Sequence, residues 1–163
     1  MTYGRLVTKD IFIDPAFSEM SEGAQLWALK LLVLADDFGR GYGGQLYLRK
    51  ILGLDDAADL GEIKRRTEEL GQHGIIEFFE HEGHKYHYFP HWFAIQRFNS
   101  NCHPKPTRIP NPPNLAKAYV RGCLKLCRVM LKKKAHDPDA YTDVTILFDA
   151  GWEDRDEKDD HND

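Results

Sequence analysis

The sequence lacks the features that mark membrane, secreted and repeat proteins. Its longest apolar run is five residues, at 31–35, whereas a membrane-spanning helix needs about 20. It has only three cysteines, an odd number, and its first ten residues lack the apolar stretch of a secretory signal. No segment repeats at a fixed period, which argues against solenoids and propellers. We therefore expect a cytoplasmic protein that has no membrane partner.

Residues 83–136 lack acidic side chains altogether. This stretch carries eleven Lys and Arg and no Asp or Glu, although the whole chain has a net charge of −4. The same count gives −6 for residues 1–82, −3 for 137–148 and −6 for 149–163. Because a field of one sign attracts polyanions, nucleic acid is the first partner class to consider. The alternative is a solvated charged surface without a partner.

Length and composition indicate one globular domain with extensions. The chain has 163 residues, of which 42% are hydrophobic and 12% aromatic. Most of the bulk lies before residue 100. The aromatic residues expected in the core are Trp27, Phe38, Phe78, Phe89, Trp92 and Phe93.

Three helices are predicted in the first half. Ser21 is a suitable N-cap for residues 22–37, which are apolar on almost every side and are therefore expected in the middle of the core. A short second helix is predicted over residues 46–52. The third helix spans about residues 59–72, with one apolar stripe made of Leu60, Ile63, Thr67 and Leu70.

The glycine-rich stretch GRGYGG, at residues 39–44, separates the first two helices. It lacks the lysine and the serine or threonine of a phosphate-binding loop. We interpret it as a flexible corner between helices.

A β-hairpin is predicted after the third helix. Residues 75–80 and 85–89 are strand-like and flank a four-residue turn region at 81–84. Three helices followed by a hairpin is the order of a winged-helix domain, a variant of the helix-turn-helix scheme. The expected fold class is therefore α+β, with a winged-helix domain over residues 1–100 built from three helices plus a β-hairpin wing.

The composition changes three times after this domain. Residues 101–113 include five prolines and form a Pro-rich basic arm, which favours extended geometry. Residues 114–148 contain a basic amphipathic helix, at about 115–134, and a short strand at 141–148. Residues 149–163 hold eight acidic and two basic side chains and are interpreted as a disordered acidic tail.

The last helix is predicted to have two opposite faces. At about 100° per residue, its basic side chains share one arc and its apolar side chains fill the other. We expect the apolar face to dock and the basic face to contact phosphates, although a lysine-rich helix packed on the core or on a partner is the alternative. The basic set is Lys117, Arg121, Lys125, Arg128 and Lys132, and the apolar set is Leu115, Tyr119, Cys123, Leu126, Cys127 and Met130.

Eight further side chains complete the predicted nucleic-acid-binding set. Lys64, Arg65 and Arg66 lie on the exposed face of the third helix, and Arg65 is the first choice for a base contact. Their neighbours Glu62, Glu68 and Glu69 weaken this prediction, because carboxylates repel phosphate. His84 and Lys85, together with His87, lie where a wing approaches the DNA backbone. The remaining members are Arg97, Lys105 and Arg108.

No catalytic or cofactor-binding motif is recognisable. The histidines and the cysteine between residues 81 and 103 lack the paired spacing of a zinc site. Cys123 and Cys127 lie one helical turn apart on the apolar face, so we expect buried thiols. No nucleophile motif is present. We expect no metal, no cofactor and no enzymatic activity; a metal-dependent hydrolase is the alternative.

Three strings resemble a known family: MSEGAQLWALKLLVLADDFGR, EELGQHGIIEFF and HKYHYFPHWFAIQRFNSNCHPKPTRIPNPP. They resemble the N-terminal winged-helix domain of phage replisome organisers and DnaD-like replication initiation proteins, over about residues 5–113. The most specific pieces are Ala35-Asp36-Asp37 before Gly39-Arg40, Gly74-Ile75-Ile76 before the hairpin, and Trp92 with Gln96.

The resemblance implies a non-enzymatic DNA-binding module of phage or prophage replication. Its implied partners are DNA, a second copy in a homodimer, and a replicative helicase or its loader. The second, helicase-loading domain of the family has no counterpart in this sequence. The alternative function is a protein-interaction or dimerisation module of a replisome or helicase-loading assembly, without direct DNA binding.

Overall fold

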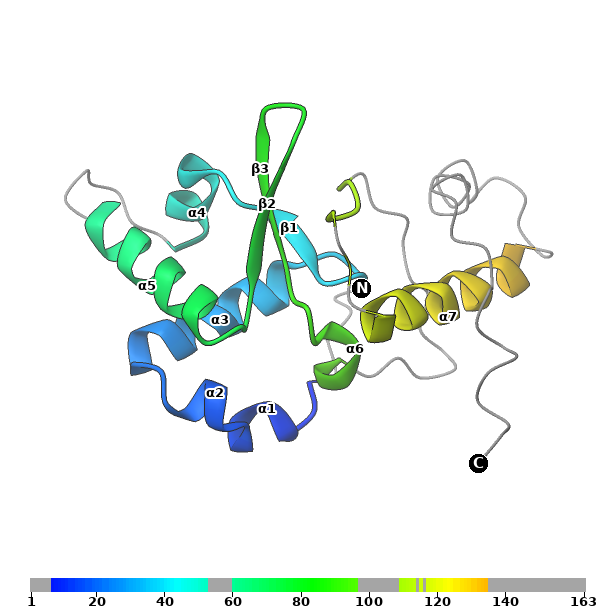
Figure 1. The fold of residues 1–163 in the computed structure, drawn as a ribbon, viewed down its shortest axis with the longest axis horizontal. Coiled ribbons are helices and arrows are strands. Elements are labelled where there is room, and N and C mark those ends of the chain that lie inside the picture. Colours follow the sequence, from blue (N-terminus) through cyan, green and yellow to red (C-terminus); the bar gives the residue numbers. More distant parts are fainter. Residues whose placement is uncertain (1–6, 53–59, 97–108, 114, 116, 135–163) are drawn as a thin grey trace.

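The computed structural model describes residues 7–52, 60–96, 109–113, 115 and 117–134, with side chains in the last helix described up to Cys127. The fold is mixed α+β, as expected (Figure 1). Among these residues, no helix is long and apolar enough to cross a membrane. The elements are α1 (Asp10–Ile13), α2 (Pro15–Ser18), α3 (Glu22–Leu34), β1 (Arg40–Tyr42), α4 (Gln45–Leu52), α5 (Leu60–Gln72), β2 (Glu77–His81), β3 (His84–Tyr88), α6 (Trp92–Ile95) and α7 (Lys117–Lys134).

Helix α3 begins at the predicted cap and ends three residues early. The Ser21 hydroxyl accepts a hydrogen bond from the Ala24 amide at 3.3 Å. After Leu34, the Asp36 carboxylate accepts hydrogen bonds from the amides of Phe38 and Arg40, at 2.9 and 2.8 Å, and so holds a turn.

The expectation that this helix lies in the middle of the core is wrong. Trp27, Leu31 and Leu32 are buried, but the side chains of Leu26, Val33 and Leu34 are more than half exposed. The reason is that the helices packed against α3, which are mainly α5 and α4, leave these three side chains uncovered, so the helix is less buried than its all-round apolar sequence predicts.

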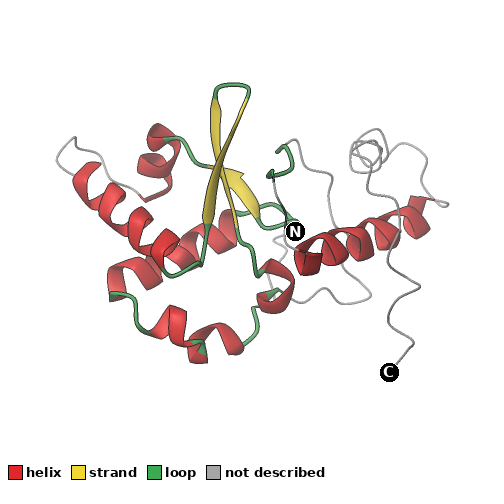
Figure 2. Ribbon diagram, in the orientation of Figure 1, coloured by secondary structure: helices red, strands yellow, loops and turns green. Residues whose placement is uncertain are grey.

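The strands, yellow in Figure 2, form an antiparallel sheet with the order β1-β3-β2. Strand β3 pairs Tyr88 with Arg40 on one side and with Glu77 on the other. The interpretation of residues 39–44 as a flexible corner is therefore wrong, because residues 40–42 form an edge strand. Glycine is needed there for close packing: a Cβ at Gly41 would lie 2.4 Å from the His87 ring.

The β-hairpin is confirmed, with a tighter turn than predicted. Glu82 and Gly83 alone connect the strands, and both have positive φ angles, of 50° and 75°. Positive φ at both central residues is the requirement of a type I′ turn, whose twist suits a two-stranded ribbon.

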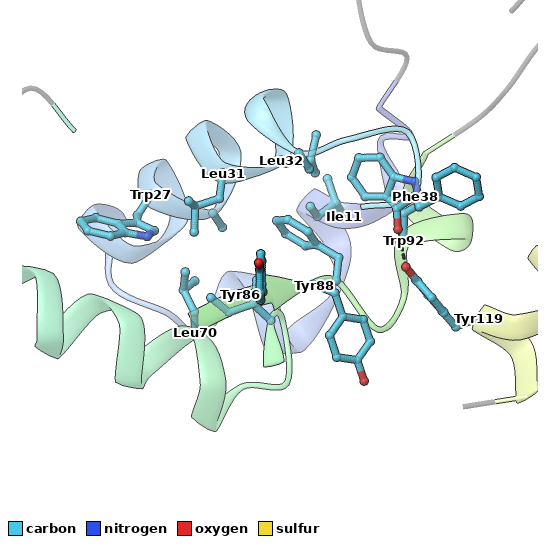
Figure 3. Close-up of a cluster of buried hydrophobic side chains, with 14 of the residues drawn as sticks. Ile11, Trp27, Leu31, Leu32, Phe38, Leu70, Tyr86, Tyr88, Trp92 and Tyr119 are labelled. Carbon is cyan, nitrogen blue, oxygen red and sulfur yellow. Dashed lines mark hydrogen bonds between the residues drawn. The ribbon is translucent and has the colours of Figure 1, made fainter. Parts of the chain in front are cut away.

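The core joins α3, α5, the sheet and α7 (Figure 3). Among the six predicted core aromatics, Trp27, Phe38, Phe89 and Trp92 are buried, while Phe78 and Phe93 are partly buried. The predicted stripe of α5 also faces inward, since Ile63 and Leu70 are buried and Leu60 and Thr67 are partly buried.

Helix α7 docks through the face that the sequence predicts. Tyr119, Cys123, Leu126 and Cys127 are buried, and Leu115 just before the helix is partly buried. The Tyr119 hydroxyl donates a hydrogen bond to the Phe38 carbonyl, drawn as a dashed line in Figure 3. The predicted strand at 141–148, the acidic tail and residues 101–108 of the arm lie outside the described residues.

Candidate functional site

Helix α5 pairs its cations with its own carboxylates. Arg65 donates to Glu62 from Nε and Nη2, at 2.9 and 2.8 Å, and Arg66 donates to the same carboxylate at 2.5 Å. Lys64 lies 3.8 Å from Glu68. Hydrogen bonds from Arg65 and then Arg66 lower the pKa of Glu62 to about 2. A phosphate at this helix would have to compete with carboxylates that are already ionised and bonded.

Glu69, the other acidic neighbour of Arg65, links two helices. It accepts hydrogen bonds from the Ser21 amide at 2.5 Å and from the Ser21 hydroxyl at 2.8 Å. These bonds lower the pKa of Glu69. Glu69 therefore satisfies a donor at the start of α3 and ties it to α5, a structural role that the sequence does not reveal because the partners are 48 residues apart.

The hairpin exposes two of its three predicted contacts. His84 and Lys85 are exposed, and the Lys85 ammonium lies 5.6 Å from the centre of the Phe78 ring. The expectation that His87 faces DNA is wrong, because it is buried in the central strand and donates from Nδ1 to the Tyr42 carbonyl at 3.1 Å. Burial lowers the pKa of His87 to about 4.

This buried histidine predicts a loss of stability in mild acid. The unfolded chain binds a proton near pH 6.5, whereas folded His87 does so only near pH 4. The free energy of unfolding should therefore fall by about 2 kcal/mol between pH 7 and pH 5. Urea unfolding at the two pH values measures this, and His87→Gln should remove most of the difference. An equal difference in wild type and variant would contradict the assignment.

Helix α7 presents cations that have no acidic partner among the described residues. Lys117, Arg121 and Lys125 are exposed at successive turns, and none forms an ion pair with another described residue. Their opposite face is held by the buried Tyr119 and Cys123. Burial raises the pKa values of Cys123 and Cys127 to about 12 and 11, so both thiols stay protonated at neutral pH.

Arg40 is a buried cation whose structural role the charge pattern of the sequence does not predict. It is 1% exposed, and its Nη1 donates to the Asn111 side chain at 2.6 Å. Its Nε lies 3.4 Å from Asp36 Oδ2, and its guanidinium lies 4.9 Å from the centre of the Phe38 ring. Within the described residues, Nε and Nη2 have no hydrogen-bond acceptor. Arg40 thus anchors the end of the Pro-rich arm to the core.

The predicted cations lie on three separate elements. In Figure 1, α5 and α7 lie on opposite sides of the hairpin. Arg97, Lys105 and Arg108 lie outside the described residues, as do the side chains of Arg128 and Lys132. The described residues contain no cluster of three potential metal ligands. Comparison with protein-family models, curated proteins and solved structures finds no match to this chain.

Proposed function

We propose that this chain is a non-enzymatic, winged-helix DNA-binding protein that grips the phosphate backbone of duplex DNA. The element order α3, β1, α4, α5, β2, β3 and the sheet order β1-β3-β2 support the winged-helix assignment. The resemblance to replisome organisers suggests the replication of phage or prophage DNA as its setting.

The observation that carries the proposal is the docked, acid-free face of α7. Lys117, Arg121 and Lys125 follow one another at spacings of four residues, so they form a row about 6 Å apart along the helix. A rigidly held row of cations suits a line of phosphates, and each neutralised phosphate releases counterions. Because the cations of α5 already pair with carboxylates of the same helix, we expect phosphate contacts by α7 to contribute more to DNA binding than base contacts by α5.

The proposal predicts that the affinity for duplex DNA falls with salt and that the cations of α7 cause much of this dependence. Fluorescence anisotropy with a labelled duplex at several salt concentrations gives the slope of log K against log salt. Replacing Lys117, Arg121 and Lys125 together with alanine should lower the magnitude of this slope by about 2 to 3, since each phosphate contact contributes about 0.9.

A triple variant with the same loss of charge serves as the matched control. Lys9, Lys30 and Lys50 lie outside the predicted set, and their replacement by alanine should change the slope much less. Equal effects of the two triple variants would contradict a specific role of α7. Absence of salt-sensitive duplex binding by micromolar wild-type protein would overturn the proposed function.

A second candidate function is self-association through α3. The exposed side chains of Leu26, Val33 and Leu34 are costly to leave in water and favour a protein partner. Light scattering of the wild-type protein tests self-association independently of DNA binding. Twice the chain mass at micromolar concentration would support self-association, and the monomer mass throughout would contradict it.

A further inference from the structure

A hollow lies beside the hairpin, where β1 ends and α4 and β3 begin. Its volume is about 390 Å³, and it is lined by Tyr42, Gly44, Leu46, Tyr47, His84 and Lys85. The lining is aromatic and apolar on the side of β1 and α4 and basic on the side of the hairpin. None of the described residues that line it carries a carboxylate. This composition differs from that of α5, where every cation has an acidic partner.

The aromatic wall is rigidly supported. The Tyr42 ring lies 5.3 Å from the Tyr47 ring, edge to face, and 5.7 Å from the Tyr86 ring. Tyr86 in turn stacks on Phe79 at 5.5 Å, inside the core. Tyr42 is nevertheless 46% exposed, so part of a fixed aromatic surface faces solvent. A preformed aromatic surface loses little conformational entropy when a flat ligand stacks on it.

The rim adds one apolar and two basic side chains. Leu46 is 81% exposed, although it is a large apolar residue at the start of a helix. His84 and Lys85 of the hairpin are exposed, and the Lys85 ammonium lies 5.6 Å from the centre of the Phe78 ring. The exposed ring of Tyr42, the apolar side chain of Leu46 and the cation of Lys85 together favour an anionic ligand with a flat, weakly polar ring.

We propose that this hollow binds an unstacked base of single-stranded DNA. The base stacks on Tyr42 beside Leu46, and its flanking phosphate lies between His84 and Lys85. Stacking on aromatic side chains combined with basic residues along the backbone is how proteins hold single strands without reading sequence. This inference rests on the proposed function, and it adds that the hairpin region distinguishes single-stranded from duplex DNA.

The test compares a fluorescein-labelled oligothymidylate with a duplex of the same length by anisotropy. Tyr42→Ala should weaken binding of the single strand about tenfold, and Tyr42→Phe should keep the wild-type affinity. Leu46→Asp should also weaken single-strand binding, whereas Leu46→Lys should not. Because Leu46 is so exposed, both of its variants are expected to fold, which circular dichroism checks. Duplex affinity should be much less affected by Tyr42→Ala.

Two results would overturn the inference, and they are distinguishable. If the wild type binds duplex with salt sensitivity but Tyr42→Ala and Leu46→Asp leave single-strand binding unchanged, the inference fails and the proposed function stands. The same conclusion follows if the two variants weaken duplex and single-strand binding equally. If the wild type binds neither DNA, the proposed function fails and the inference fails with it; a protein ligand for the hollow then becomes the better account.

Discussion

Replacing Tyr119 with alanine is expected to release α7 from the core. The ring is buried and lies against the rings of Tyr88 and Phe93, at 5.4 and 5.5 Å between centroids. Removing a buried aromatic side chain typically costs about 3 to 5 kcal/mol. Hydrogen exchange should show the loss, because the amides of residues 119–127 should exchange much faster in the variant while those of α3 change little.

Tyr119→Phe is the matched control. It keeps the ring and removes only the hydroxyl that donates to the Phe38 carbonyl, so the expected loss is about 1 to 3 kcal/mol. Because Tyr119→Phe keeps α7 docked, the salt dependence of duplex binding by this variant should stay near that of the wild type. Wild-type protection of α7 in Tyr119→Ala would show that other contacts hold the helix.

Replacing Arg40 with methionine is expected to lower the free energy of unfolding by about 3 to 5 kcal/mol. Methionine fills similar volume but leaves the Asp36 carboxylate without its cation in a poorly hydrated site. The substitution also removes the bond to Asn111, and with it the attachment of residues 110 and 111. Urea unfolding of wild type and variant measures the difference.

A double-mutant cycle isolates the charge interaction. Asp36→Asn retains an oxygen that can accept from the Phe38 and Arg40 amides but removes the negative charge. In the Asp36→Asn background, Arg40→Met should therefore cost less than in the wild type, by roughly 1 to 3 kcal/mol. Strictly additive losses would mean that packing, and not charge, makes Arg40 important.

Short sequence patterns predict the elements whose hydrogen bonds and buried faces are set by residues close together in the chain. Ser21 identifies the start of α3 because its hydroxyl bonds an amide three residues away. The spacing of Tyr119, Cys123 and Leu126 identifies the docked face of α7 because helical geometry fixes which residues share a side. The two short helices α1 and α2 were not predicted, although Asp14 caps α2 and Pro15 occupies its first position.

Strand β1 could not be predicted from neighbouring residues alone. Its glycines resemble a chain break, and only the pairing of Arg40 with Tyr88 and of Tyr42 with Tyr86 makes the segment a strand. The error about His87 follows from it, since a hairpin without β1 would leave that side of β3 exposed. Because β1 was not predicted, the buried His87 was wrongly predicted to contact DNA.

The sequence predicts which residues of the candidate site are charged, but not which of them form ion pairs or hydrogen bonds with one another. The sequence identifies the basic residues of α5, yet it does not show that Glu62 holds both Arg65 and Arg66 while Glu69 is directed to Ser21. Which partner each carboxylate binds depends on where the side chains lie in the folded protein. The hollow beside Tyr42 was likewise not predicted, because it depends on β1 pairing with β3 and on the start of α4.

Cys123 and Cys127 lie on the buried face of α7, so the reactivity of their thiols measures how often this helix leaves the core. Protonated and covered, Cys123 and Cys127 should react with alkylating reagents only in molecules whose α7 has transiently left the core. Their alkylation rates, resolved by peptide mass spectrometry, then give the equilibrium of that opening. DNA that binds across the helix in its closed position should slow both reactions, without any label being introduced.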